Sequence, residues 1–139
     1  MALLVQLIEW EEVMLEKFTL MQSEIAQRPH LLRLGALFSD TVLVQIDEEE
    51  FYLTFEKGHL FDVTQGLSRK TPRTFAMRTD AEALSEFWTA RPKPGFHDIF
   101  GLVKLGRGRI DGNILALVKN LRFFKEVMAL PRANEEALG

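Results

Sequence analysis

The spacing of apolar positions changes from helical to strand-like after residue 40. Over residues 3–27 the apolar side chains share one face of a 3.6-residue period and glutamates with polar residues occupy the other, which predicts one amphipathic helix. Pro29 ends or restarts this helix, because proline lacks the amide hydrogen that a helix interior needs. A short helical turn over residues 31–34 completes the predicted N-terminal segment.

Apolar residues recur at every second position in four later stretches, which predicts four short strands. The predicted strands cover residues 41–46, 51–56, 59–64 and 73–78. Lys57 and Gly58 form the tight turn between the middle pair, since glycine tolerates the positive φ of a primed hairpin turn. The short separations between the strands favour an antiparallel meander.

The helical period returns in the second half of the chain. Thr79 and Glu82 form a capping-box pattern, in which the threonine caps a helix and the glutamate reaches back to its amide. A second short helix is predicted over residues 96–103 from its apolar spacing. A glycine-rich strand over residues 106–112 then leads into one long apolar helix over residues 113–130.

This final helix carries more apolar side chains than a single core-facing stripe needs. The chain also has 11 phenylalanines against 1 tyrosine and 2 tryptophans, so most of its aromatic rings have no polar group to leave in water. These rings are either ordinary core or part of the lining of a cavity for an apolar ligand. Such a cavity needs few polar groups, because binding is driven mainly by the removal of apolar surface from water, at roughly 25 cal/mol per Å².

Composition and charge narrow the function classes. At 139 residues the chain is most simply one domain. A net charge of -3 and a pI near 5.6 argue against a nucleic-acid-binding protein, and the lack of cysteine excludes thiol catalysis and zinc-finger sites. No apolar run is long enough to predict a transmembrane helix.

No residue pattern indicates catalysis, a metal site or a cofactor. The histidines His30, His59 and His97 fall in different predicted elements, without the spacing of a metal-binding motif. Asp98 follows His97, but neighbours on a helix point about 100° apart, so the two side chains do not orient each other. We interpret both as polar residues at a helix start, where Asp98 favours the positive end of the helix. A small enzyme using His97 or Asp62 is the least favoured alternative.

Three stretches stand out by their order along the chain. Residues 51–60 join an aromatic strand to a glycine hairpin, residues 74–86 run from a strand into a capped helix, and residues 108–113 place a short strand and a Gly-Asn turn before an apolar helix. Together they resemble the sterol-carrier-protein-2 family, over residues 38–130 of the chain. The resemblance implies an α+β fold, with a five-stranded, mostly antiparallel sheet covered by helices and an added N-terminal amphipathic helix.

The same resemblance implies a hydrophobic tunnel that accepts fatty acids, acyl thioesters, sterols or isoprenoid-type lipids. Some small bacterial members of the family are lipid-binding accessory proteins, for instance in quinone biosynthesis. Residues 90–95 depart from the family pattern of a glycine followed by an Asp-Pro or Asn-Pro pair, which puts the shape of the tunnel mouth in question. Residues 136–139 differ from the peroxisomal tripeptide of eukaryotic members, so we expect a cytoplasmic, bacterial protein.

The expected ligand-binding residues come from the predicted short helix, the glycine-rich strand and the final helix. They are Phe96, Phe100, Leu102, Val103, Leu117, Leu121, Phe124, Arg107 and Arg109. The apolar members would wall the tunnel against the apolar face of the sheet. Arg107 and Arg109 lie two residues apart, hence on one face of a strand, and would form a basic rim for a fatty carboxylate or an acyl-CoA phosphate. Lys93 and Lys104 would complete this rim; the alternative is that all these cations are solvated charges protecting an edge strand.

Two functions follow from this interpretation. The first is non-enzymatic binding or transfer of a hydrophobic ligand by a core over residues 38–131, followed by a frayed tail over residues 132–139. The alternative is a protein-interaction or scaffold module that docks a partner, or forms a homodimer, through a helical segment over residues 1–37. The N-terminal helix can pack on its own sheet, pair with a second subunit or lie on a membrane. Its acidic polar face argues against the membrane, where such helices usually carry Lys and Arg.

Overall fold

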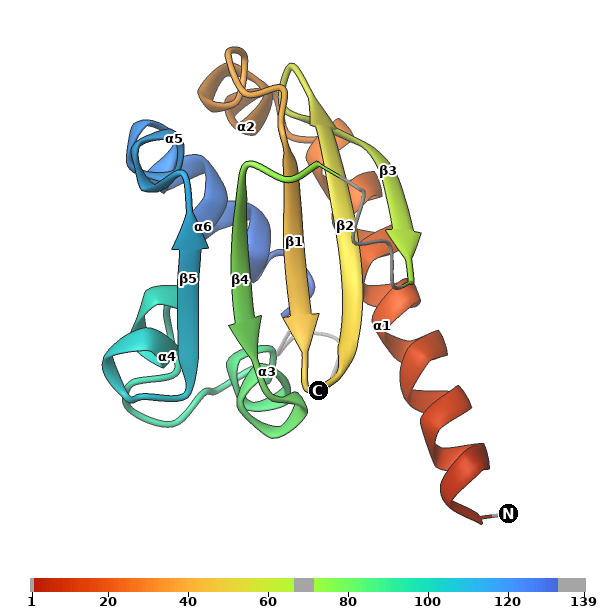
Figure 1. Ribbon diagram of the computed structural model, residues 1–139. Helices are drawn as coiled ribbons and strands as arrows, with labels where there is room; N and C mark the ends of the chain where they lie inside the picture. Colours follow the sequence, from red (N-terminus) through yellow and green to blue (C-terminus); the bar gives the residue numbers. More distant parts are fainter. Residues whose placement is uncertain (1, 67–71, 133–139) are drawn as a thin grey trace.

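Five strands form one mixed sheet in the computed structural model of the chain, which describes residues 2–66 and 72–132, with side chains from residue 12 onward. The helices and strands are, in chain order, α1 (Ala2–Ala26), α2 (Pro29–Leu34), β1 (Thr41–Ile46), β2 (Glu49–Glu56), β3 (His59–Gln65), β4 (Phe75–Thr79), α3 (Ala81–Phe87), α4 (Ile99–Lys104), β5 (Gly108–Gly112), α5 (Ile114–Lys119) and α6 (Leu121–Ala129). Figure 1 shows α1 and α6 behind the sheet, with α4 and α5 at opposite ends of β5. The predicted α+β fold is confirmed. Within the described ranges, no helix has the length and apolarity needed to cross a bilayer.

The strand order is β3-β2-β1-β4-β5, so the chain crosses from one side of β1 to the other between β3 and β4. In the described part of the chain, three strand pairs are antiparallel, but β4 pairs with β1 in parallel. The predicted antiparallel meander is therefore wrong at its fourth strand. Alternation fixes which side chains face the core but not which neighbour a strand takes, and the connection from Gln65 to Phe75 is too long to impose a hairpin.

The core lies between one face of the sheet and helices α1 and α6. From α1 it includes Met14, Phe18, Met21 and Ile25, which are at most 1% exposed. The ring of Phe18 lies 5.2 Å from the ring of Phe51 on β2, between centroids. The predicted N-terminal amphipathic helix is confirmed, and its buried stripe packs on the sheet of its own domain.

The long C-terminal helix is interrupted at Asn120, so the prediction of one helix over residues 113–130 is wrong. Asn120 has a non-helical backbone, with φ -121° and ψ 25°, and its Nδ2 donates to the carbonyl oxygen of Ala116 at 2.9 Å. An asparagine side chain that bonds the backbone competes with the regular helical pattern. The break lets α5 and α6 bury different faces: α5 buries Leu117, whereas α6 buries four side chains.

Helix α3 begins one residue later than the capping-box pattern predicts. Asp80, not Thr79, is the N-cap residue, and its Oδ1 accepts a hydrogen bond from the amide of Ala83 at 2.8 Å. Thr79 ends β4 instead, and its Oγ1 donates to the carbonyl oxygen of Arg107 at 2.8 Å. The sequence offers two capping residues in a row, and the pairing of β4 decides between them.

Helix α4 also starts later than predicted, at Ile99. The Oδ1 of Asp98 accepts from the amide of Phe100 at 2.8 Å, so the expected role of Asp98 at a helix start is confirmed. A Cβ on Gly101 would lie 2.2 Å from the carbonyl oxygen of Gly95. Only glycine therefore allows α4 to approach the preceding loop this closely.

Candidate ligand-binding site

Three of the seven apolar residues predicted to line a tunnel are buried in the core. Leu102 of α4, Leu117 of α5 and Phe124 of α6 are at most 4% exposed. The ring of Phe124 meets Phe75 of β4 edge-on, with 5.3 Å between centroids, and lies 6.2 Å from the ring of Phe100. Aromatic rings thus occupy the region where α4 and α6 meet the sheet.

The other four apolar residues lie nearer the surface. Phe96 and Phe100 are partly buried and pack against the core. Val103 and Leu121 are exposed, at 38% and 40%. The predicted lining residues therefore divide among the core, its boundary and the solvent-facing surface.

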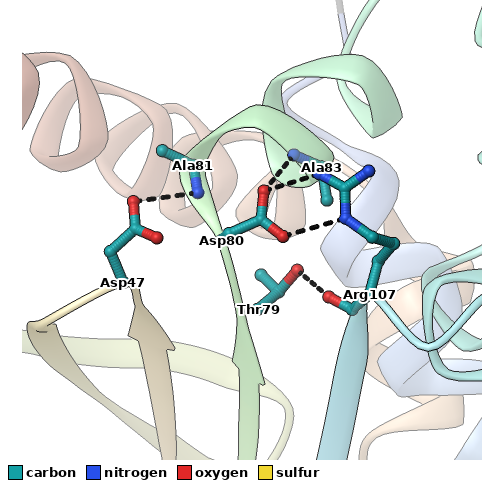
Figure 2. Close-up of polar contacts among 6 residues, drawn as sticks. All are labelled: Asp47, Thr79, Asp80, Ala81, Ala83 and Arg107. Atoms are coloured by element: carbon teal, nitrogen blue, oxygen red, sulfur yellow. Dashed lines mark hydrogen bonds and ion pairs between the residues drawn. The ribbon is translucent and has the colours of Figure 1, made fainter.

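Arg107 connects the start of β5 to the start of α3 through Asp80 (Figure 2). Its Nη2 donates to Oδ1 of Asp80 at 2.9 Å and its Nε donates to Oδ2 at 3.1 Å, so the contact is bidentate. Figure 2 also shows Asp47, directly after β1, whose Oδ2 accepts from the amide of Ala81 at 3.2 Å. Two carboxylates therefore hold the first turn of α3 against the ends of β1 and β5.

The Arg107 guanidinium holds the pKa of the Asp80 carboxyl below its ordinary value, against the raising effect of partial burial. The same hydrogen bond raises the pKa of Arg107. The two side chains are 36% and 35% exposed, so water screens the pair from one side. A ligand anion at this point has to share Arg107 with Asp80.

Arg109 has a separate acidic partner. Its Nε lies 3.6 Å from Oδ2 of Asp111, and its side chain is 73% exposed. Asp111 also accepts from Nε of Arg78 at 2.9 Å, and this bond lowers the pKa of the Asp111 carboxyl. Lys93, from the predicted basic rim, has its Nζ 3.3 Å from Glu86. Positive and negative charges therefore alternate along the rim.

A pocket of about 290 Å³ beside α3 brings together two of the predicted site residues, Phe96 and Arg107. Its lining consists of Glu82, Ser85, Glu86, Thr89, Lys93, Phe96 and Arg107. Phe96 also packs against the core cluster that contains Phe124. Its ring therefore lies at the boundary between the pocket and the aromatic core.

A second hollow, of about 510 Å³, lies at the joint between α5 and α6 and includes the predicted residue Leu121. Its lining consists of Val118, Lys119, Leu121, Arg122, Lys125 and Glu126. Val118 and Leu121 are 58% and 40% exposed, so this hollow opens on the outer surface of the helices.

The histidines are not assembled into a catalytic or metal-binding cluster in the part of the chain that is described. His30 Nε2 lies 3.3 Å from Oε1 of Glu126, with both side chains more than a third exposed. The carbonyl oxygen of His97 accepts from Nη2 of Arg132. Among residues 12–66 and 72–132, no three potential metal-binding side chains lie close enough to hold an ion.

Trp88 and Arg132, which were not among the predicted site residues, connect the end of α3 to α6 and the residues that follow it. The Nε1 of Trp88 donates to the carbonyl oxygen of Met128 at 2.8 Å, within the core. Arg132 donates from Nε to the carbonyl oxygen of Phe87 at 2.9 Å. The guanidinium carbon of Arg132 lies 4.8 Å from the centre of the Phe87 ring. Arg132 is the first residue of the predicted frayed tail, and residues 133–139 lie outside the described residues. The sequence signal for the bond to Met128 was the tryptophan at position 88, because a buried indole N–H needs a hydrogen-bond acceptor.

Solved structures with this arrangement include sterol carrier proteins. A crystal structure of sterol carrier protein 2 has a TM-score of 0.65 and 11% identity, over 86% of this chain and 95% of that chain. A conserved hypothetical protein from Thermus thermophilus has a TM-score of 0.59 and 12% identity, over 82% and 85% of the two chains. The UbiJ-SCP2 ubiquinone synthesis protein has a TM-score of 0.55 and 16% identity, over 81% and 90%.

No family model and no curated protein sequence matches the chain. At 11–16% identity the solved structures show a shared fold alone. The sheet and its helices therefore have the sterol-carrier-protein-2 fold.

Proposed function

We propose that this chain, with its sterol-carrier-protein-2 fold, binds a hydrophobic ligand and carries or presents it without changing it chemically. The ligand class comprises fatty acids, acyl thioesters, sterols and isoprenoid-type lipids. The observation that carries the proposal is the position of Phe96, which lines the pocket on one side and packs against the aromatic core on the other. Movement of this one ring would open the pocket toward the core cluster.

The pocket alone, at about 290 Å³, is small for a lipid, since ligand sites span about 300–1,000 Å³. A longer ligand needs room from the core. The rings of Phe75, Phe100 and Phe124 carry no polar atom that an entering chain would leave unpaired. Replacing ring contacts by ligand contacts keeps apolar surface out of water, at roughly 25 cal/mol per Å².

The polar groups at the pocket are balanced in charge. Lys93 lies 3.3 Å from Glu86, and Arg107 lies 2.9 Å from Asp80. A ligand carboxylate has to compete with these acids, whereas a hydroxyl or carbonyl oxygen can accept from a free ammonium or guanidinium hydrogen. This balance favours a neutral polar end, such as that of a sterol or an isoprenoid quinone, over a free fatty acid. The ubiquinone synthesis protein among the structural neighbours makes the quinone a suitable probe.

Titration of delipidated protein with fluorescent sterol, isoprenoid and fatty-acid probes tests the proposal. We expect saturable binding of one ligand per chain, tightest for neutral probes. Phe100→Trp places a larger ring at the core boundary and should weaken binding roughly tenfold by overpacking. Phe61→Trp makes the same replacement on β3, at a side chain that is 66% exposed, and should leave the affinity unchanged.

Two results would contradict the proposal. One is a flat titration with every probe class, from protein whose circular dichroism shows the native fold. The other is an equal loss of affinity in Phe61→Trp and Phe100→Trp, which would mean that the ring at position 100 has no special relation to the ligand.

A second candidate function is that of an interaction module, which docks a partner or a second copy of the chain through α1. Figure 1 shows that the N-terminal turns of α1 project beyond the sheet. The sequence of these turns is rich in leucine, and Val13 and Leu20, farther along the helix, are 39% and 42% exposed.

For either function we propose a cytoplasmic location, because a chain without cysteine suits a reducing compartment.

A further inference from the structure

Charge is distributed unevenly along this acidic chain. Residues 91–126 contain eight Lys or Arg and three Asp or Glu, a net charge of +5, whereas residues 1–86 contain eight and fifteen, a net charge of -7. The basic stretch forms α4, β5, α5 and most of α6. It also contains six of the eleven exposed large apolar side chains among the described residues. Positive charge and exposed apolar surface therefore come from the same segment of the sequence.

The exposed apolar side chains are concentrated on α5. Ile114, Leu115 and Val118 are 45%, 63% and 58% exposed, while Leu117 points into the core at 4%. At about 100° per residue, the three exposed positions fall within an arc of roughly 100°, whose centre lies about 110° around the helix from Leu117. Leu121, 40% exposed, continues this surface past the break at Asn120, and we call the four exposed residues the α5 apolar patch.

Cationic side chains border the α5 apolar patch. Lys119, Arg122 and Lys125 line the same hollow as Val118 and Leu121. Among the described residues Lys119 makes no ion pair, whereas Arg122 lies 3.3 Å from Glu126 and Lys125 lies 2.6 Å from Asp98. The side chains of Arg122 and Lys125 are 77% and 44% exposed. Exposed pairs of this kind are weak, so both cations can exchange their carboxylate for another anion.

We propose that the α5 apolar patch, with Lys119, Arg122 and Lys125, docks the protein on an anionic lipid bilayer. In this position α5 lies in the plane of the interface, with its apolar side chains among the acyl chains. The long stems of the three cations reach the lipid phosphates. A helix of six residues buries little area, so the docking is reversible and depends on negative lipid.

The choice of a bilayer over an acidic protein rests on the proposed function, because an apolar ligand has to be exchanged with a lipid phase. The charge on α1 supports this orientation of the protein on the bilayer. Glu12 and Glu16 lie on the outer surface of α1, where they line a hollow with Leu15. An anionic bilayer repels this acidic helix and attracts the α5 side of the molecule.

Co-sedimentation with vesicles tests the docking. We expect the full chain to bind phosphatidylcholine vesicles that contain one third phosphatidylglycerol, not pure phosphatidylcholine vesicles, and to be released by salt. Each unit of positive charge removed from the docking surface should weaken partitioning roughly fivefold. Lys119→Glu changes the charge there by two units and should therefore weaken partitioning roughly 25-fold. Leu115→Glu should also abolish most of the binding. Phe61→Glu adds the same charge on β3 at a side chain that is 66% exposed, and should bind like the wild type.

Three results with vesicles would overturn the docking proposal. They are no binding to the anionic vesicles at low salt, wild-type binding by Lys119→Glu and Leu115→Glu, and an equal loss in Phe61→Glu. Self-association that these two variants abolish in the absence of vesicles would identify a second copy as the occupant, and would also overturn it. Binding of water-dispersed probes by Lys119→Glu separates the two proposals, because it reports on the interior site alone.

Discussion

Asp80 has two structural roles at the junction between the sheet and α3. It caps α3 by accepting from the amide of Ala83, and it accepts two hydrogen bonds from Arg107 at the start of β5. The same carboxylate therefore fixes the direction in which α3 leaves the sheet and the position of Arg107 at the pocket. Replacement by asparagine or alanine separates the roles, because asparagine keeps a capping oxygen and alanine does not.

We expect Asp80→Ala to lose more stability than Asp80→Asn, with about 1 kcal/mol of the difference from the cap. Urea denaturation of the three proteins measures both losses. Because Arg107 lowers the pKa of folded Asp80, the contribution of their pair is present above the ordinary aspartate pKa of about 4. It is lost as the pH falls through the lower folded-state pKa. The advantage of the wild type over Asp80→Asn should therefore hold near neutral pH and shrink below about pH 4. An advantage that did not change with pH would contradict this assignment.

At the scale of elements, α3 is tied to α6 by one buried hydrogen bond. The carbonyl of Met128 lies in the last turn of α6, where carbonyl groups have no helical partner, and Trp88 donates to it. The tie matters for the candidate site, because α3 borders the pocket and α6 carries Phe124.

We predict that Trp88→Phe lowers the free energy of unfolding by about 2 kcal/mol, since it removes the donor to a buried carbonyl and leaves a smaller ring. Urea denaturation monitored by far-ultraviolet circular dichroism measures the change. Thr89→Val, at the next residue, removes a hydroxyl that bonds only exposed groups and should cost less. Equal losses in the two variants would show that the buried hydrogen bond contributes little.

At the scale of the whole molecule, α1 belongs to the core along only part of its length. Met14, Phe18, Met21 and Ile25 are buried under the sheet, whereas the N-terminal turns extend past it (Figure 1). Deleting the whole helix would therefore remove four core side chains and unfold the domain. A shorter deletion separates a docking role of α1 from its packing role.

Removal of residues 2–11 should leave the fold intact and convert any α1-mediated dimer to a monomer. Analytical ultracentrifugation over a range of concentrations measures the association of the full and shortened chains. A deletion of residues 133–139 serves as the control at the other terminus. Monomeric behaviour of the full chain at every concentration would contradict dimerisation through α1.

Local sequence determined the elements and their buried faces. Val42, Val44 and Ile46 alternate along one strand and are all fully buried, as a period of two requires. The stripe of α1 is equally clear in its spacing. These features are predictable because burial of one face acts on each element through its own periodicity. The order of the aromatic strand, the capped helix and the short glycine strand was enough to suggest the fold.

Tertiary structure determined how those elements pair and pack against one another. Parallel pairing of β4 with β1 and the hydrogen bonds from Arg107 to Asp80 both join segments that are far apart in the sequence. The nine predicted site residues therefore divided into core, boundary and surface, although all are plausible lining by sequence. Periodicity predicts which face of an element is apolar. Only the tertiary packing determines whether that face contacts other side chains, a ligand or a membrane.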